Sequence, residues 1–168
     1  VRRITCHLLE QGRTLPGFIG DISYAQSNRE RYEGFCQALT DAGKKVDSSL
    51  CLTTPLGIDT YREEIDTFLS SLSRMPDAFV CASDYVACIL MQLLEKRGLR
   101  VPEDVAVSGF DNNTEDLLAE HLTTVQVFNE ELGARLALQI LYRIKYPNTP
   151  HEITYLGTNV LYRDSTGD

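Results

Sequence analysis

Apolar and polar residues alternate along the chain in blocks that predict short strands separated by amphipathic helices. Runs that stay apolar without alternating, such as AFVCA at 78–82, are typical of buried strands. One helix face is predicted by apolar residues at the i, i+3, i+4, i+7 spacing, namely Tyr32, Phe35, Cys36 and Leu39. The predicted helices are 2–12, 27–42, 60–74, 84–97, 113–119 and 129–146, and the predicted strands are 17–20, 46–52, 78–82, 105–109, 122–127 and one within 158–166.

This order of elements predicts an α/β fold. Strands that alternate with helices and are apolar on both sides indicate a mainly parallel sheet covered by helices on both faces. Right-handed crossovers then lead to an open, doubly wound sheet. A length of 168 residues fits one domain, or one domain with part of another.

Polar side chains follow three predicted strands at the edge where open α/β sheets bind ligands. Asp21, Asp84 and Asp111 each come just after a strand that ends in a small residue. Arg31 lies near the start of the predicted helix 27–42, which follows the strand before Asp21. At this helix end the dipole disfavours a cation by about 0.3–1 kcal/mol. Carboxylates and amides opposite a guanidinium suit a polyhydroxylated small molecule, because each forms charge-assisted hydrogen bonds with hydroxyls.

Each of these residues also has a structural interpretation that the sequence leaves open. Asp84 can cap the helix that it precedes, and Ser27 can cap its own helix, because Ser27-Asn28-Arg29-Glu30 has the S-x-x-E form of a capping box. The polar segment 111–113 can form an Asx-turn, and Arg31 can belong to a surface ion pair.

The predicted helix at 84–97 has no polar side. From Tyr85 to Leu94 only Gln92 is polar, so one face can cover the sheet while another is expected to contact a second protein surface. A self-complementary two-fold contact is the commonest solution, although burial within one domain is the alternative. The predicted homodimer interface comprises Tyr85, Ile89, Met91, Gln92 and Leu93.

Charge and cysteine usage narrow the partners. With 16 basic against 24 acidic residues, a net charge of −8 and no basic run, these residues are not expected to hold DNA by themselves. Five cysteines without a C-x-x-C spacing indicate free core thiols in a reducing cytoplasm, not a disulfide framework or a zinc site. No apolar run is long enough to span a bilayer, so no membrane partner is expected. The N-terminal residues do not have the form of a signal peptide, and the chain is expected to begin inside a longer protein.

Signatures of catalysis are missing from the sequence. It contains no G-x-S-x-G, Walker A or G-x-G-x-x-G motif, and its three histidines stand apart from one another. No catalytic residue, metal or cofactor is therefore predicted.

Five segments resemble, in order and spacing, the effector-binding core of LacI/GalR-type bacterial transcription regulators: RYEGFCQAL, PDAFVCASDYVA, GLRVPEDVAVSGFDN, LTTVQ with LGARLALQIL, and LYRDSTG. The resemblance implies a periplasmic-binding-protein-like sensor of two subdomains, a small effector in the cleft between them, and DNA binding by a separate N-terminal helix-turn-helix. It implies that 1–121 and 152–168 form the C-terminal subdomain and that 122–147 cross into the N-terminal one. The DNA-binding domain and the first half of the N-terminal subdomain would lie outside this chain.

The same resemblance assigns residues to the effector site. Arg31, Asp111 and the loop with Ser27 match effector contacts, while Ser83 and Pro55 stand where sugar-binding relatives often have asparagine and a stacking aromatic residue. The full predicted site is Ser27, Arg31, Pro55, Ser83, Asp84, Asp111 and Asn112. The expected function is the sensing and dimerising part of a repressor that binds a sugar or sugar derivative. A solute-binding protein of a transporter is the alternative, and an enzyme of flavodoxin-like architecture comes third.

Overall fold

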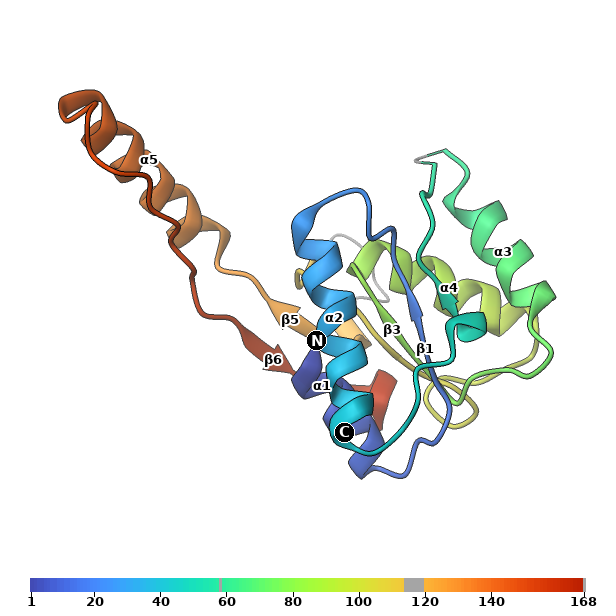
Figure 1. The fold of residues 1–168 in the computed structure, drawn as a ribbon. Coiled ribbons are helices and arrows are strands. Elements are labelled where there is room, and N and C mark those ends of the chain that lie inside the picture. Colours follow the sequence, from blue (N-terminus) through green and yellow to red (C-terminus); the bar gives the residue numbers. More distant parts are fainter. Residues whose placement is uncertain (58, 114–119, 168) are drawn as a thin grey trace.

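The chain folds into an α/β body with a long arm, in a computed structural model that describes residues 1–57, 59–113 and 120–167 (Figure 1). The predicted strand–helix alternation is confirmed. In chain order the elements are α1 (Arg2–Glu10), β1 (Pro16–Ile19), α2 (Gln26–Asp41), β2 (Cys51–Leu52), α3 (Tyr61–Ser71), β3 (Ala78–Cys81), α4 (Asp84–Lys96), β4 (Ala106–Ser108), β5 (Thr124–Gln126), α5 (Asn129–Lys145) and β6 (Asn159–Leu161), with 3-10 turns at Ser48–Leu50 and Asp164–Thr166.

The body is built on a parallel sheet of four strands in the order β2-β1-β3-β4. Successive residues of each strand point to opposite faces, so Phe18 packs under α1 and α2 while Ile19 packs under α3 and α4. In β3, Val80 and Cys81 divide between the two faces in the same way. Two separate apolar cores result, which explains why the strands are apolar throughout.

The predicted strand at 46–52 is wrong over most of its length. Only Cys51–Leu52 pair with β1, and the preceding residues form a 3-10 turn. Asp47 is the reason, because its carboxylate accepts hydrogen bonds from the backbone N–H and the hydroxyl of Ser49, at 3.0 and 2.6 Å. The predicted helix at 113–119 falls almost entirely outside the described residues.

After β4 the chain returns as β5, which lies beside the four-stranded sheet. The backbone N–H of Gly109 donates to Thr123 O at 2.8 Å, and that of Asp111 donates to Val125 O at 3.0 Å. β6 then pairs antiparallel with β5, with Val125 opposite Val160. Residues 122–125 are buried in the body by these contacts.

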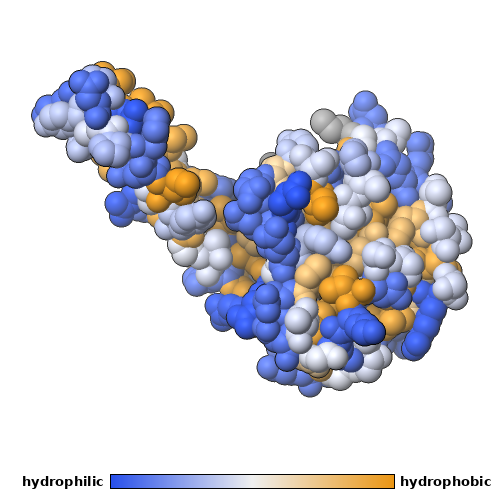
Figure 2. Space-filling view, in the orientation of Figure 1, coloured by the Kyte–Doolittle hydropathy of each residue, from blue (hydrophilic) through white to orange (hydrophobic). Residues whose placement is uncertain are grey.

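The helix α5 projects away from the body, with the chain segment that follows it returning alongside (Figure 1). None of its residues is buried. Figure 2 shows hydrophobic residues along this arm, and the large exposed ones include Leu132, Leu136, Ile140 and Ile144, spaced four residues apart on one helix face. No helix in the described part of the chain is both long and apolar enough to cross a membrane, and all five cysteines are free.

Replacing Phe79 by alanine should lower the free energy of unfolding by about 3–5 kcal/mol. Phe79 is fully buried in β3 and its ring meets Phe68 edge-on at 6.4 Å between centroids, so the substitution leaves a cavity that the rigid sheet cannot close. Urea denaturation followed by circular dichroism measures the loss. Tyr155→Ala is the control, because this ring is 78% exposed. Equal losses for both variants would contradict the position of the core.

Candidate functional site

The carboxyl ends of β1, β3 and β4 meet at one edge of the sheet, and Arg31 reaches this edge from α2. α2 begins at Gln26, with Ala25 as an extended N-cap residue that makes no side-chain cap. Ser27 therefore lies inside the first turn and is exposed, so the predicted capping box at Ser27 is wrong. The entry to the helix is held instead by Asn28, whose side-chain amide donates to the backbone oxygen of Asp21 at 2.9 Å.

The guanidinium of Arg31 is fixed from several sides and is only 17% exposed. It donates to the backbone oxygen of Ala82 at 2.5 Å, lies 3.7 Å from the centre of the Phe110 ring, and is 3.5 Å from a carboxylate oxygen of Asp111. Burial lowers the pKa of Arg31, while the carboxylates of Asp111 and Asp84 act in the opposite direction. The ion-pair interpretation of Arg31 thus holds in a partly buried form, with a predicted site residue as its partner.

Asp111 stands opposite Arg31 on a strained loop. Its φ is 112°, and that of Asn112 is 53°, a region that costs on the order of 1–3 kcal/mol per residue outside glycine. The Asp111 side chain remains 43% exposed. Burial and the nearby charge of Asp84 raise its pKa, and Arg31 opposes this shift. Asp111 is therefore accessible while its backbone is held in place.

Asn112 joins this loop to the strands beside it. Its side-chain amide donates to Gln126 Oε1 at 2.6 Å, and its side-chain oxygen accepts from Arg163 at 2.8 Å. The backbone N–H of Asn113 donates to Asp84 Oδ2 at 2.8 Å. In an Asx-turn this hydrogen bond would go to a side chain within the segment 111–113. The segment is instead ordered by Asp84, a residue outside it.

Asp84 does not cap α4. The N-cap residue is Ser83, whose hydroxyl oxygen accepts from the backbone N–H of Val86 at 3.3 Å. Asp84 itself is 2% exposed, and its carboxylate accepts from the Thr124 hydroxyl at 2.6 Å and from the backbone of Asn113. Burial raises the pKa of Asp84 although these hydrogen bonds act to lower it.

Asp21 has a similar structural task after β1. Its carboxylate accepts from the backbone and hydroxyl of Ser23, at 2.7 and 2.6 Å, and from the backbone N–H of Leu56 at 3.3 Å. Burial acts to raise the pKa of Asp21, but these hydrogen bonds outweigh it and the pKa lies below its usual range. Asp21 thereby holds the loop that carries exposed Pro55 beside the end of β1.

Of the predicted effector residues, the structure brings Arg31 and Asp111 into direct contact. Ser83 follows Ala82, the residue whose backbone oxygen binds Arg31. Ser27 and Pro55 are exposed on segments that follow β1 and β2. Sequence reasoning missed Phe110, which stacks on Arg31, although an aromatic residue directly before Asp111 was a visible signal.

The predicted dimer face of α4 is only partly accessible. Ile89 and Leu93 are buried in the core shared with α3, so this part of the prediction is wrong for a surface contact and the single-domain alternative holds there. Tyr85 is 58% exposed and meets Tyr61 edge-on at 5.7 Å, while Met91 and Gln92 are half-buried.

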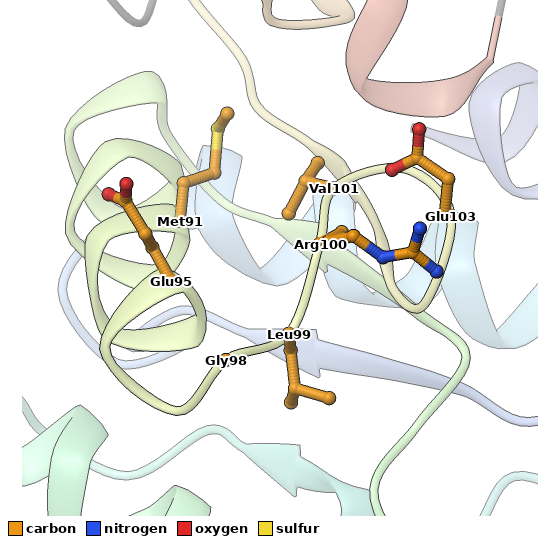
Figure 3. Close-up of a pocket in the computed structure, with 7 residues that line it drawn as sticks. All are labelled: Met91, Glu95, Gly98, Leu99, Arg100, Val101 and Glu103. Atoms are coloured by element: carbon orange, nitrogen blue, oxygen red, sulfur yellow. The ribbon is translucent and has the colours of Figure 1, made fainter.

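A cavity of about 490 Å³ lies beside the C-terminal half of α4 (Figure 3). Arg31, in contrast, binds Ala82, which precedes the first residue of this helix. Met91 and Glu95 of α4 face the turn that leads to β4 across the cavity. None of the predicted effector residues lines it. The lining residues are Met91, Glu95, Gly98, Leu99, Arg100, Val101 and Glu103. Across residues 1–57, 59–113 and 120–167, no group of three or more His, Cys, Asp or Glu side chains could hold a metal ion.

Residues 5–166 match the model of the periplasmic binding protein-like domain family. The chain belongs to this family. It is 35% identical over 130 residues to the HTH-type transcriptional regulator DegA of Bacillus subtilis, a match that covers 76% of this chain and 38% of DegA. Among solved structures, a LacI-family regulator from Sanguibacter keddieii is 28% identical with a TM-score of 0.85, over 99% of this chain and 63% of that one. In the complex of the transcriptional regulator CelR with cellobiose, the CelR chain is 30% identical with a TM-score of 0.87. That match covers 98% of this chain and 50% of the CelR chain.

These relatives confirm the predicted resemblance to LacI/GalR-type regulators and the predicted fold. The chain of this periplasmic binding protein-like domain spans between 38% and 49% of the length of the curated relatives that it matches. The relatives named above are regulators, not enzymes.

The carboxyl group of Asp111 should titrate above the usual range of an aspartate. Its pKa is raised by burial and by Asp84, whereas the pKa of Asp104 is lowered by its hydrogen bonds with Arg100 and serves as the control. Carbon-detected NMR of the side-chain carboxyls measures both. Because the Arg31 charge favours ionised Asp111, Arg31→Gln should raise the pKa of Asp111 further and leave that of Asp104 unchanged. A fall for Asp111 would contradict the ion pair.

Proposed function

We propose that this chain is the effector-sensing and dimerising part of a cytoplasmic bacterial transcription regulator, a repressor of the LacI type, and that it has no catalytic activity. The observation that carries the proposal is the Arg31–Asp111 pair, held at the ligand-binding edge of the sheet with one partly buried guanidinium and one accessible carboxylate. The resemblance to LacI/GalR-type regulators assigns DNA binding to a separate N-terminal domain, and the net charge of −8 supports this, because phosphate binding needs an excess of basic residues.

The proposed effector is a neutral, polyhydroxylated molecule, a sugar or a sugar derivative. A guanidinium can only donate hydrogen bonds and an ionised carboxylate can only accept them, whereas a hydroxyl does both. Neighbouring hydroxyls therefore satisfy Arg31 and Asp111 together, and the two charges cancel without a charged ligand. The complex of CelR with cellobiose supports a carbohydrate. Ser27, Ser83 and Pro55 complete the proposed contacts.

The second wall of the cleft is proposed to come from sequence outside this chain. α5 exposes an apolar face and has no buried residue, which indicates a surface that another part of the protein covers. The resemblance assigns the segment 122–147 to an N-terminal subdomain and the remainder to the C-terminal one. Because 122–125 are buried in the body, we place the crossing point after β5, in the segment 127–128 that leads to α5.

The proposed mechanism is a shift between two states of the sensor. An effector that contacts both walls of the cleft binds a closed arrangement more tightly than an open one, and it changes the equilibrium by that difference in affinity. In a homodimer joined through α4, the change would alter the spacing of two DNA-binding domains. The exposed part of α4, with Tyr85, Met91 and Gln92, is the proposed centre of that contact.

Arg31→Ala in the full-length protein should abolish stabilisation by the effector. Thermal-shift assays with cellobiose, other sugars, phosphosugars and nucleobases identify the effector. A ligand present at 100 times its dissociation constant raises the free energy of unfolding by about 2.7 kcal/mol. The matched control is Arg29→Ala, which removes an exposed arginine two residues earlier on the same helix. An Arg31→Ala protein that still responds like the Arg29→Ala protein would refute the assignment.

Tyr85→Glu should convert a dimer of the full-length protein into a monomer, because it places a charge in the proposed apolar contact. Sedimentation equilibrium at micromolar concentration measures the mass. Lys96→Glu changes an exposed residue at the other end of the same helix and should leave the dimer intact. A wild-type protein that sediments as a monomer would overturn the proposed interface.

A further inference from the structure

Residues 109–113, which follow β4, are organised around one buried carboxylate, that of Asp84. Its two oxygens face different partners: Oδ1 accepts from the Thr124 hydroxyl at 2.6 Å and Oδ2 accepts from the Asn113 backbone at 2.8 Å. The backbone N–H of Asp84 also donates to Phe110 O at 2.8 Å. One residue of α4 thus binds both sides of Asp111.

Thr124 extends this arrangement to the strained residues. Its hydroxyl donates to Asp84 and accepts from the backbone N–H of Asn112 at 3.2 Å. Among the described residues, Asn112 and Asp111 are the two non-glycine residues with positive φ, a conformation that persists only where the surroundings hold it. Asp84, Thr124 and Asn112 therefore form a continuous chain of hydrogen bonds ending at the strained backbone.

The space around Asp84 is fitted to the loop as well. A Cβ atom at Gly109 would lie 2.2 Å from Asp84 Oδ1 and 2.9 Å from the Leu122 side chain, so only glycine allows the backbone this close. At 2% exposure Asp84 is also too deeply buried to contact an effector, in contrast to Asp111.

We propose that Asp84 is a positioning residue, which acts through Thr124 and Asn113 to hold the 109–113 loop in the conformation that sets Asp111 opposite Arg31. Because Asp84 is the first residue of α4, it also joins the effector loop to the helix of the proposed dimer contact. The hydrogen bonds of Asp84 alone support its role in positioning the loop. Its effect on effector binding rests on the proposed function.

Thr124→Val is the decisive variant, because valine has the shape of threonine without the hydroxyl. Two NMR signals of the 168-residue chain report the loop directly. Positive φ at Asp111 and Asn112 gives strong intraresidue HN–Hα cross-peaks, and the Phe110 ring shifts the side-chain Nε–H signal of Arg31. Thr124→Val should lose both signatures, while Thr124→Ser keeps the hydroxyl and should retain them.

Two further variants separate positioning from general loss of stability. Asp84→Ala removes both carboxylate oxygens, so the hydrogen bonds to the Thr124 hydroxyl and to the Asn113 backbone are both lost, and the same signatures should disappear. Asp77→Ala is its matched control, because Asp77 also binds backbone N–H groups, those of Thr14 and Leu15 at 2.6 and 2.9 Å, but at the opposite edge of the sheet. Asp77→Ala should keep both signatures.

Retention of the signatures in Thr124→Val or in Asp84→Ala, or their loss in Asp77→Ala, overturns the proposal. The two test variants remove opposite partners of the Asp84–Thr124 hydrogen bond, so the one that folds decides if the other does not. Cellobiose binding by the full-length protein is measured separately. If the NMR signatures respond as expected but the full-length protein binds none of the screened sugars, the positioning role of Asp84 is supported and the carbohydrate assignment is overturned.

Discussion

Parallel pairing of β1, β3 and β4 is the constraint on which the rest of the site depends. It brings three strand ends to one edge of the sheet. The aspartates that follow these strands, Asp21, Asp84 and Asp111, therefore lie at the same edge although they are far apart in sequence. The shared position does not give these aspartates a shared role. Burial separates them, because a carboxylate that is enclosed must be satisfied by the protein itself.

Asp21 and Asp84 accept hydrogen bonds from backbone N–H groups and so determine the course of the loops at this edge. Asp111 remains accessible and is paired with Arg31. The candidate site thus consists of the charged pair Arg31–Asp111 at the open edge and, behind it, the two buried carboxylates of Asp21 and Asp84. These buried carboxylates matter because a binding group is useful only when its position is fixed before the ligand arrives.

The helix α4 and the arm illustrate two different outcomes of apolar sequence. In α4 most apolar residues are covered within the chain, by the sheet and by α3, so an unbroken apolar composition did not require a partner for every face. In α5 the apolar residues stay exposed, because the arm leaves the body and no described element covers it. An apolar helix face therefore indicates a further contact only where the tertiary structure leaves that face exposed.

The sequence by itself determined the class of fold, the order of the elements and the edge of the sheet at which the polar residues gather. These follow from local patterns, since the spacing of apolar residues and the position of glycines act within a few residues. It also pointed to Arg31 and Asp111 as members of one site. The strand predicted at 46–52 failed because the side chain of Asp47 offered the backbone competing hydrogen bonds. The cap at Ser27 failed because α2 begins before it, at Gln26, with Ala25 as the N-cap residue.

Only the tertiary structure decided which aspartate is buried, which face of α4 is covered, and that Asp84 reaches Thr124, 40 residues away. The physical reason is that burial and hydrogen-bond partners depend on segments distant in sequence. No pattern around Asp84 distinguishes a helix cap from a carboxylate enclosed by the loop of another strand.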